Sequence, residues 1–421
     1  MTDTSVDVPS KPTIKLFPEQ QEAKEAFLRW YSNLEYDGEG FIVLTDGKFP
    51  IFRIFGYAGT GKTTITKSIV EEIEGIKLYG AYTGKAALVM TRNDMPARTL
   101  HSLVYKPVLP DKAHCLDLRA KAKATVDADE RDDLLKQVQA AEQLSFELND
   151  ESDLIGASLL ILDECSMVND EMLADIQSFG VPMLVLGDPG QLPPISGTGA
   201  LVRDKPDVLL TTIHRQALDN PIIDLSVRAR GGVPIPQKQF GTSAHIPIAA
   251  FSKEIALGAD QILVGKNVTR IAINRKARKL LSFEGTYPVP GDKLICLRNE
   301  RKLGIFNGLI CTCVERGDDY PTYIEYRIRT EEDRELVVPM HRAFFDEYDT
   351  PGIVKALKWW DFKDTSSFDY GYAITVHKSQ GSQWDNVVFY DDKFFTWDPK
   401  NRKRWLYTGI TRAAERLTLV S

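Results

Sequence analysis

Residues 56–63 read GYAGTGKT, which is the pattern GxxxxGK(S/T) of a phosphate-binding loop. The glycines let the backbone turn so that its N–H groups converge on phosphate oxygens. Lys62 can place a positive charge on the outer phosphates, and the Thr63 hydroxyl can bind Mg²⁺. An apolar run at residues 51–55 precedes the loop and a helical pattern at residues 64–73 follows it. Because a helix N-terminus attracts anions, the sequence predicts a bound nucleoside triphosphate.

The composition narrows the class of protein. The chain has 421 residues, 43% of them hydrophobic and 26% charged, which is typical of a folded chain with more than one core. A formal net charge of −7 argues against binding nucleic acid by bulk charge, but a local basic groove is compatible with it. The five cysteines do not follow a zinc-binding pattern, so we expect reduced thiols. The apolar runs are too short for a membrane span.

Strand and helix patterns alternate along most of the chain, which predicts an α/β fold with ligands at the carboxyl ends of parallel strands. Two segments interrupt this alternation. The first is residues 106–157, whose middle at 116–144 is rich in Ala, Lys, Asp, Glu and Gln and predicts a solvated helical insert. Its flanks at 102–108 and 144–148 could pair as a β-hairpin. Residues 291–368 contain short alternating strands, which predict a small β-barrel inserted into the second α/β unit.

Two further apolar strands end in polar loops. The first delivers Asp163 and Glu164 at its tip. Asp163 can hold Mg²⁺ and Glu164 can activate the attacking water, so the adjacent pair favours hydrolysis over binding alone. The second strand leads into GDPGQLPP at residues 187–194, where Gln191 could sense the γ-phosphate and connect to the next domain.

Taken in order, these motifs resemble those of the superfamily 1B helicases, the branch that contains phage Dda helicases and bacterial RecD. The resemblance covers about residues 16–421. Besides the loops above, it is carried by LFPEQ at 16–20, AYTGKAA at 81–87, TLHS at 99–102, DECSM at 163–167, HRQ at 214–216, TVHKSQG at 375–381 and YTGITRA at 407–413.

The resemblance implies an ATP site between two RecA-like domains, with ATP and Mg²⁺ as cofactors. The residues implied to bind ATP are Gln20, Gly56, Gly59, Thr60, Gly61, Lys62, Thr63, Thr64, Gln380 and Gly381. Gln21 is the alternative to Gln20 as the reader of adenine. Mg²⁺ is implied at Thr63 and Asp163. The implied catalytic residues are Lys62, Glu164, Gln191, Arg215 and Arg412, and the two arginines act from the second domain.

The resemblance also implies a path for single-stranded DNA across both domains. The residues implied to contact it are Thr83, Lys85, His101, Ser102, Asn267, Thr375, His377 and Lys378. Asn267 could instead be a simple helix cap. An aromatic side chain at a hairpin tip would stack on the terminal base pair of a duplex, and Phe146 and Tyr105 are the candidates for this wedge. Residues 304–308, GIFNG, resemble a turn of the family's inserted barrel or an ordinary hairpin turn.

The implied fold has two RecA-like parallel-sheet P-loop domains, with an SH3-like β-barrel inserted in the second. Its divisions are a flexible tail at 1–12, domain 1A at 13–103 and 158–200, insert 1B at 104–157, domain 2A at 201–285 and 369–421, and insert 2B at 286–368.

The implied function is that of a monomeric ATP-dependent DNA helicase. It would move 5′→3′ on single-stranded DNA and open junctions with duplex DNA during phage replication or recombination. A single-strand-binding protein or replisome components are the expected further partners, no membrane partner is expected, and the location is cytoplasmic, in the host if a phage encodes the chain. The alternatives are a RecD-like translocase subunit of a larger complex, an ATP-switched nucleic-acid clamp, and the same motor on RNA.

Overall fold

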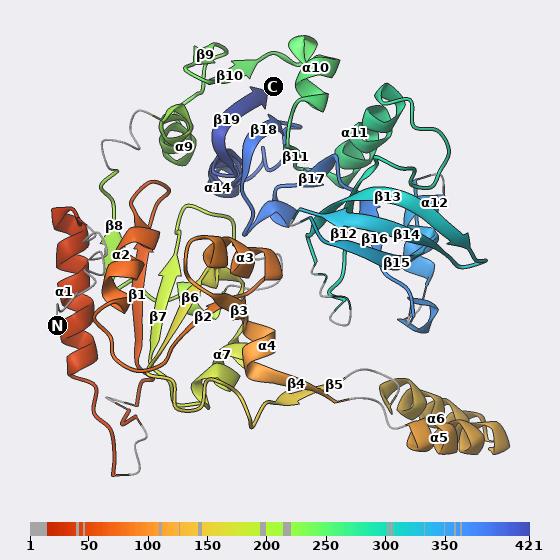
Figure 1. The fold of residues 1–421 in the computed structure, drawn as a ribbon, viewed down its shortest axis with the longest axis horizontal. Coiled ribbons are helices and arrows are strands. Elements are labelled where there is room, and N and C mark those ends of the chain that lie inside the picture. The colour runs from red at the N-terminus through yellow and green to blue at the C-terminus, as the bar shows by residue number, and fades with distance from the viewer. Residues whose placement is uncertain are drawn as a thin grey trace, which may run out of the picture.

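A computed structural model of the chain describes residues 15–421. Its description omits residues 39–41, 45–46, 109–111, 126, 142–144, 194–198, 214–219, 301–302, 304, 306, 332, 349, 358 and 363. Two sheets lie next to each other, a third sheet packs beside the second, and a two-stranded arm projects from the first (Figure 1). The expected tail at residues 1–12 lies outside the described residues.

The first sheet is parallel throughout and has the strand order β3-β2-β6-β7-β1-β8. Its strands are β1 (Ile51–Gly56), β2 (Lys77–Ala81), β3 (Ala97–Thr99), β6 (Leu159–Asp163), β7 (Met183–Gly187) and β8 (Val208–Leu210). Its helices are α1 (Pro18–Ser32), α2 (Lys62–Val70), α3 (Gly84–Arg92), α4 (Leu100–Val104) and α7 (Asp170–Gln177). The predicted bounds of β6 and β7 are confirmed, because runs of Leu, Ile and Val suit strands that are covered on both faces.

The first sheet extends further along the chain than we expected. β8 pairs with β1 through Ile54 and Val208, although we placed the end of domain 1A at residue 200. The reason is that Leu210 is buried against the helical layer that contains α1 and α2, so this strand belongs to the first core. The rest of the division into domains stays a prediction.

The second sheet has the order β17-β11-β18-β19-β10-β9, and only the β9–β10 pair is antiparallel. Its strands are β9 (Gln239–Phe240), β10 (Ser243–Ile246), β11 (Gln261–Val264), β17 (Ala373–Thr375), β18 (Trp384–Tyr390) and β19 (Ala413–Val420). The accompanying helices are α9 (Pro221–Gly231), α10 (Lys253–Leu257), α11 (Asn267–Leu280) and α14 (Pro399–Ile410). The predicted α/β class with parallel sheets is therefore confirmed.

The third sheet is antiparallel, with the order β15-β14-β13-β12-β16. It consists of β12 (Lys293–Cys296), β13 (Ile310–Asp319), β14 (Tyr323–Thr330), β15 (Glu335–His341) and β16 (Phe368–Tyr370), and the short helices α12 (Ala343–Asp346) and α13 (Ile353–Ala356) follow β15. Ser366, just before β16, exchanges backbone hydrogen bonds with Pro339 and His341 of β15, which brings the two edges together. An SH3-like identity for this sheet stays a prediction.

The insert in the first domain is a β-ribbon that carries two helices. β4 (Tyr105–Val108) pairs with β5 (Ser145–Leu148), as the flanks of the insert predicted. Between them α5 (Lys112–Ala124) packs on α6 (Ala128–Ala141), and the pair lies far from the rest of the molecule (Figure 1). The Ala-, Lys- and Asp/Glu-rich composition favours helices in this position, so the far end of the ribbon is a helical hairpin rather than a tight turn.

We expected reduced thiols, no zinc site and no membrane-spanning segment. All five cysteines are free and buried. Within the described part of the chain, His, Cys, Asp and Glu side chains do not form a group of three or more suited to a metal ion. The described helices are all too short or too polar to cross a membrane.

Candidate ATP site and nucleic-acid face

The P-loop lies between β1 and α2, at the carboxyl edge of the first sheet. Gly59 and Gly61 have φ angles of 81° and 77°, a backbone conformation that residues with a Cβ atom rarely adopt. The Lys62 ammonium donates to the carbonyls of Gly56 (2.6 Å) and Tyr57 (3.3 Å), so the cation lies over the loop. The Thr63 and Thr64 side chains are exposed at the start of α2. This arrangement positions backbone N–H groups, a cation and hydroxyls around one anion site.

The Q-motif glutamines point in different directions. Gln20 is buried; its amide donates to the Thr60 carbonyl (3.0 Å) and accepts from the backbone N–H of Phe17 (3.0 Å). The Gln21 amide instead bonds Glu25 on the exposed side of α1. Of the two alternatives, Gln20 is therefore the one that lies against the P-loop.

The paired carboxylates lie where β6 ends. β6 pairs with β7, and β7 pairs with the P-loop strand β1. Asp163 accepts a hydrogen bond from the Glu164 backbone N–H (2.8 Å). Burial raises the pKa of both carboxyl groups, and the charge of Lys62 opposes this for Asp163 while that of Arg412 opposes it for Glu164. Glu164 has φ 52° and ψ 42°, a left-handed conformation that costs a non-glycine residue about 1 kcal/mol. The strain lies at the residue for which we predict the base role.

Glu164 meets two predicted catalytic residues, one of them from the second domain. Arg412, at the end of α14, is buried, and its Nη1 lies 3.9 Å from Glu164 Oε1. In the amide orientation that satisfies both neighbours, Gln191 donates to Glu164 Oε2 (3.3 Å) and accepts from Arg412 Nη2 (3.2 Å). The structure therefore joins these three side chains across the two sheets. Arg215 falls within residues 214–219, outside the described residues.

Tyr407 is a residue of this cleft to which our sequence reasoning gave no role. Its hydroxyl accepts from the backbone N–H of Ala58 in the P-loop (2.7 Å) and donates to Asp188 Oδ2 (2.7 Å). Its neighbour Thr408 accepts from the Leu192 backbone N–H (2.9 Å). Both residues lie inside the stretch YTGITRA. The motif therefore contained them, but the sequence did not predict their contacts with the first domain.

A second contact across the cleft, between Arg230 and Tyr57, could not be predicted from a motif. The guanidinium of Arg230, on α9, lies over the Tyr57 ring at 3.4 Å from its centroid. Such cation–π contacts hold an arginine against an aromatic face. Arg230 lies outside all the motifs, so only the packing of α9 against the P-loop brings it there.

Two residues that we expected to bind ATP lie elsewhere. The Gln380 amide donates to the carbonyl of Leu192 (2.9 Å), and Gly381 lies against Thr83 and Ala86 of α3. The reason is that residues 377–381 turn toward the first domain at motif III and α3 instead of toward the P-loop. Both residues are therefore placed at contacts between the domains.

Three of the residues predicted to contact DNA line one cavity. Asn267, Thr375 and His377 surround a space of about 580 Å³ that also borders the end of motif III. Asn267 is the first residue of α11 and its Oδ1 accepts from Arg270 Nε (3.2 Å), whereas Lys266 occupies the cap position. The alternative that Asn267 is a simple helix cap is therefore wrong. Burial lowers the pKa of His377, which favours the neutral imidazole.

Other residues predicted to contact DNA already serve the fold. Thr83 Oγ1 caps α3 by accepting from the Ala86 N–H, and the Ser102 hydroxyl donates to the Thr99 carbonyl. The His101 ring lies between those of Tyr82 and Tyr105, with centroids 5.9 and 5.8 Å away. The Thr83 hydroxyl can still donate its proton and the Ser102 oxygen can still accept a hydrogen bond, so the DNA contacts of these residues stay predictions.

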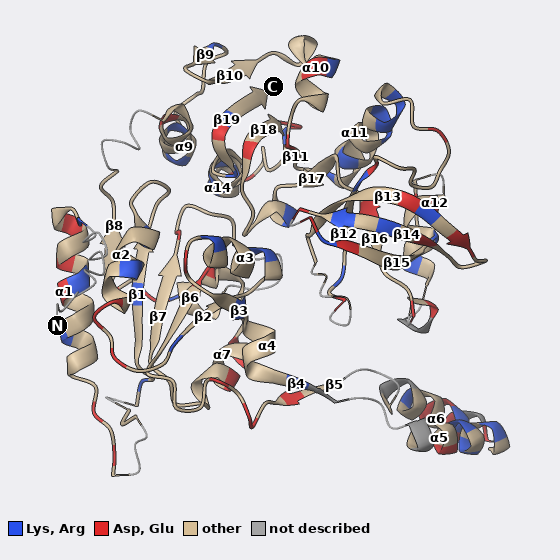
Figure 2. Cartoon of the chain, viewed as in Figure 1, with Lys and Arg blue, Asp and Glu red and all other residues tan. Residues whose placement is uncertain are grey.

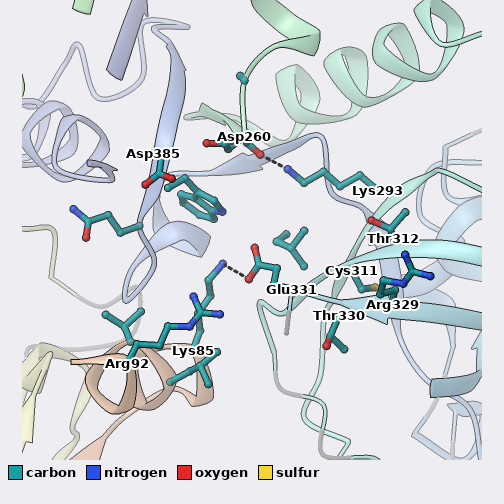
Figure 3. Close-up of a pocket in the computed structure, with 16 residues that line it drawn as sticks. Lys85, Arg92, Asp260, Lys293, Cys311, Thr312, Arg329, Thr330, Glu331 and Asp385 are labelled. Atoms are coloured by element: carbon teal, nitrogen blue, oxygen red, sulfur yellow. Dashed lines mark hydrogen bonds and ion pairs between the residues drawn. The ribbon is translucent and has the colours of Figure 1, made fainter. Parts of the chain in front are cut away.

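The two predicted lysine contacts are turned away from the cavity at Asn267. Lys85 is buried, pairs with Glu331 (3.4 Å) and lies 4.4 Å from the centre of the Trp384 ring. Figure 3 shows this ammonium directed at Glu331 of the third sheet. Lys378 bonds the Asn307 side chain of the turn in residues 304–308. The prediction that Lys85 contacts DNA is not supported, because its charge is already paired between three elements.

The wedge candidates differ in position. Tyr105 is at the base of the ribbon, where its ring packs on the first core and its hydroxyl donates to Asp175 of α7. Phe146 lies toward the far end of the ribbon, opposite Pro107, with 42% of its surface exposed. Neither residue lies at a hairpin tip, because α5 and α6 occupy that end. Tyr105 is thus wrongly placed in our prediction, and the role of Phe146 stays a prediction.

Comparisons with known proteins agree with this geometry. Residues 42–197 match the model of an AAA domain, and residues 370–420 match that of a UvrD-like helicase C-terminal domain. The chain is similar to the ATP-dependent RecD2 DNA helicase of Deinococcus radiodurans, with 25% identity over 289 residues that cover 61% of this chain and 35% of the relative. These matches agree with the resemblance of the motifs to superfamily 1B of the helicases.

Solved structures of Pif1 helicases share the fold of this chain. A Pif1 helicase from a study of forked double-stranded DNA has a TM-score of 0.51 and 17% identity, covering 96% of this chain and 92% of that one. Bacteroides Pif1 in complex with ADP-AlF3 and single-stranded DNA has a TM-score of 0.50 and 17% identity, with the same coverage. The chain spans about a third of the length of the curated relatives that it matches.

Proposed function

We propose that the chain is an ATP-driven DNA helicase that moves along single-stranded DNA and opens its junctions with duplex DNA. The observation that carries the proposal is the contact of Glu164 with Gln191 and Arg412, since the base and the arginine come from different sheets. Hydrolysis at such a site changes the contacts between the domains. A motor needs that coupling, whereas a clamp needs only ATP binding.

Each residue of the cleft has a distinct task in this proposal. Lys62 and the P-loop N–H groups hold the phosphates, Glu164 orients and deprotonates the attacking water, and Arg412 stabilises the charge that develops on the γ-phosphate. Gln191 links Glu164 to Arg412, which follows α14. Loss of the γ-phosphate would therefore change the position of α14. Tyr407 then transmits the position of α14 to Ala58 of the P-loop and to Asp188.

Mg²⁺ suits the oxygen ligands of this cleft. Thr63 offers an exposed hydroxyl and Asp163 a carboxylate, and Mg²⁺ is usually held by one or two carboxylates together with substrate phosphates. The raised pKa of the buried Asp163 fits a site whose negative charge is neutralised when a cation is bound. Bound there, Mg²⁺ would neutralise charge on the β- and γ-phosphate oxygens.

The direction of movement is proposed as 5′→3′, the direction implied by the superfamily 1B resemblance. A role in phage replication or recombination, the cytoplasmic location, the monomeric state and the further protein partners also stay predictions. The matched region is about a third of the length of these relatives, which carry additional segments.

The experiment that tests the proposal is unwinding of matched duplexes that carry a 5′ or a 3′ single-stranded tail, in DNA and in RNA. We expect ATP-dependent displacement from the 5′-tailed DNA. Displacement from the 3′-tailed DNA alone would reverse the direction, and displacement from RNA alone would change the substrate. DNA-stimulated ATP turnover without displacement would favour the RecD-like translocase subunit, and ATP-dependent binding without either would favour the clamp.

A further inference from the structure

The cavity at Asn267 has one polar wall and one aromatic wall. Asn267, Thr375 and His377 contribute amide, hydroxyl and imidazole groups. Across from them lie the rings of Phe394 and Phe395, from the segment that joins β18 to α14. We call this segment, residues 391–398 with the sequence DDKFFTWD, the aromatic loop. The cavity therefore offers hydrogen-bond donors and flat apolar faces at the same place.

The rings of the aromatic loop form a continuous series. The centroids of Phe394 and Phe395 are 4.2 Å apart, and the Trp397 ring lies 6.0 and 5.6 Å from them. The His377 ring meets both phenylalanines edge-on at 6.1 and 6.0 Å. At its inner end the series rests on the buried Trp405 of α14, 5.9 Å from Phe394. The series thus begins in the second core and ends at the surface.

Burial does not explain the outer end of this series. Trp397 is 71% exposed, the second most exposed of the large hydrophobic side chains in the described part of the chain. A tryptophan side chain is a large apolar surface that normally avoids water unless it serves an interaction. Phe394 and Phe395 are only partly buried. A ligand with flat apolar faces would cover these rings.

The aromatic loop is fixed by its surroundings. Asp392 accepts from the Lys266 N–H (2.8 Å), and Arg402 pairs with Asp391 and donates to the Phe394 carbonyl (3.1 Å). Gly265 leaves room for the loop, since a Cβ there would lie 2.3 Å from Phe394 Cβ. The loop is thus held at the start of α11 and on α14.

Two residues of the loop have left-handed backbones. Lys393 has φ 62° and Phe395 has φ 57°, and each such non-glycine residue costs on the order of 1 kcal/mol. The surrounding contacts hold the loop in this shape. Strain of this kind occurs where a fixed arrangement of side chains serves binding.

We propose that the aromatic loop is a base-stacking platform, on which Phe395 and Trp397 stack against bases of a single strand whose backbone is contacted by Asn267 and Thr375. This rests on the proposed function, which supplies single-stranded DNA as the ligand. Aromatic stacking suits a motor because every base has a π-face, so that affinity does not depend on sequence. The platform lies on the second domain, so its hold on the strand follows the movement of that domain.

The proposal is tested by comparing two strands of the same length, oligo-dT and an abasic phosphodiester strand, at one salt concentration. We expect the wild-type chain to bind oligo-dT at least tenfold more tightly than the abasic strand. Trp397→Ala should reduce this preference about fivefold to a hundredfold, because one stacked base contributes on the order of 1–3 kcal/mol. Its affinity for the abasic strand should stay unchanged.

The matched control is Tyr320→Ala, which removes an exposed aromatic side chain from the turn between β13 and β14, outside the cavity. The thermal midpoint should be unchanged in Trp397→Ala and in Tyr320→Ala, which shows that both variants fold, and Tyr320→Ala should also keep the wild-type basal ATP turnover. Phe395→Leu is the second variant; it keeps the apolar bulk, removes the flat face and should also lower the preference for oligo-dT.

The outcomes separate this proposal from the function on which it rests. Failure of the wild-type chain to bind either strand would contradict the proposed function. Equal wild-type binding of both strands would leave a DNA motor possible but would overturn the platform. Equal loss of both affinities in Trp397→Ala would also overturn it, because the loop would then support backbone contacts and not bases.

Discussion

The nucleotide cleft and the cavity at Asn267 are built in different ways. In the cleft, three loops at strand ends of the first sheet supply Lys62, Glu164 and Gln191, and Glu164 and Gln191 contact Arg412 of the second domain. On the nucleic-acid face, the predicted contacts are dispersed, and Thr83, Ser102 and Lys85 already have structural partners. The difference teaches that phosphate chemistry prescribes a short contiguous pattern, whereas contact with a strand depends on which surfaces the domains leave open.

The largest effect is expected from Glu164→Gln, which tests whether the cleft is catalytic. ATP binding should be retained, because the amide keeps the size of the side chain and one of its two acceptor oxygens. Turnover should fall by about 10²–10⁴-fold, the contribution of a positioned general base. A fluorescent ATP analogue measures binding and a phosphate-release assay measures turnover; retained turnover would require a different base. Asp170→Asn, at an exposed carboxylate on α7, is the control.

The next effect is that of Lys62→Ala, which tests the anion site itself. Turnover should fall by at least about 100-fold, since a donor to a developing charge is removed, and ATP affinity should fall as well. Lys67→Ala is the matched control, because Lys67 lies on the same helix but pairs with the exposed Asp94. Near-normal turnover in Lys62→Ala, measured in the same phosphate-release assay, would contradict the P-loop prediction.

Tyr407→Phe tests the coupling of the cleft to the second domain. Loss of the hydroxyl leaves the Ala58 N–H and the Asp188 carboxylate without this partner, at a cost of about 1–3 kcal/mol. We expect DNA-stimulated turnover to fall about tenfold or more, with a smaller change in basal turnover. Tyr390→Phe, at a tyrosine of β18 that is only partly buried, serves as the control. Equal losses in basal and stimulated turnover would mean that Tyr407 supports ATP binding alone.

The cavity between α3, β12 and β14 gives a prediction for pH. Burial lowers the pKa of Lys293 to about 8, the nearby Lys85 lowers it further, and Glu331 and Asp260 oppose the shift. Between pH 8 and the ordinary lysine pKa of about 10.4, the unfolded chain binds more protons than the folded one. The free energy of unfolding therefore rises with pH in this window, by at most about 1.4 kcal/mol per pH unit.

Lys293→Met should remove that pH dependence, and urea unfolding at pH 6, 7, 8.5 and 9.5 measures it. At pH 6 and 7 the lysine is mostly protonated in both states, so the slopes of the variant and the wild type should agree there. Lys276→Met, at an exposed position on α11, is the control and should keep the wild-type slope. Indistinguishable slopes for Lys293→Met and the wild type above pH 8 would show that the lysine keeps its ordinary pKa.

The smallest effect is expected from Lys85→Met, which sharpens the difference between the two regions. If Lys85 serves the contact with Glu331 and Trp384, DNA affinity should change less than about twofold and its salt dependence should stay the same. A phosphate contact would instead reduce the salt slope by about one. Arg92→Met, at an exposed residue on the last turn of α3, is the control. Fluorescence anisotropy across a salt series distinguishes the two outcomes.

Positively charged side chains near the two cavities are also partly engaged within the fold. Lys and Arg are frequent on α11 and α3, beside the cavities described above (Figure 2). On α11, however, Arg270 pairs with Asp369, and Arg278 with the buried Asp292. The chain therefore has basic helices despite its net charge of −7, and several of their cations form ion pairs with carboxylates of the same chain.

The sequence by itself determined the α/β class, the bounds of β6 and β7 and the presence of the P-loop. These features are local, because a buried strand and a phosphate loop are written in consecutive residues. It also contained Tyr407 within a motif without revealing its partners. Only the tertiary structure decided that β8 joins the first sheet, that Gln380 turns to motif III and that Lys85 is enclosed by three elements. It alone placed Arg230 on Tyr57 and the aromatic loop beside Asn267. The physical reason is that these contacts join residues far apart in the chain, and packing selects them from many compatible alternatives.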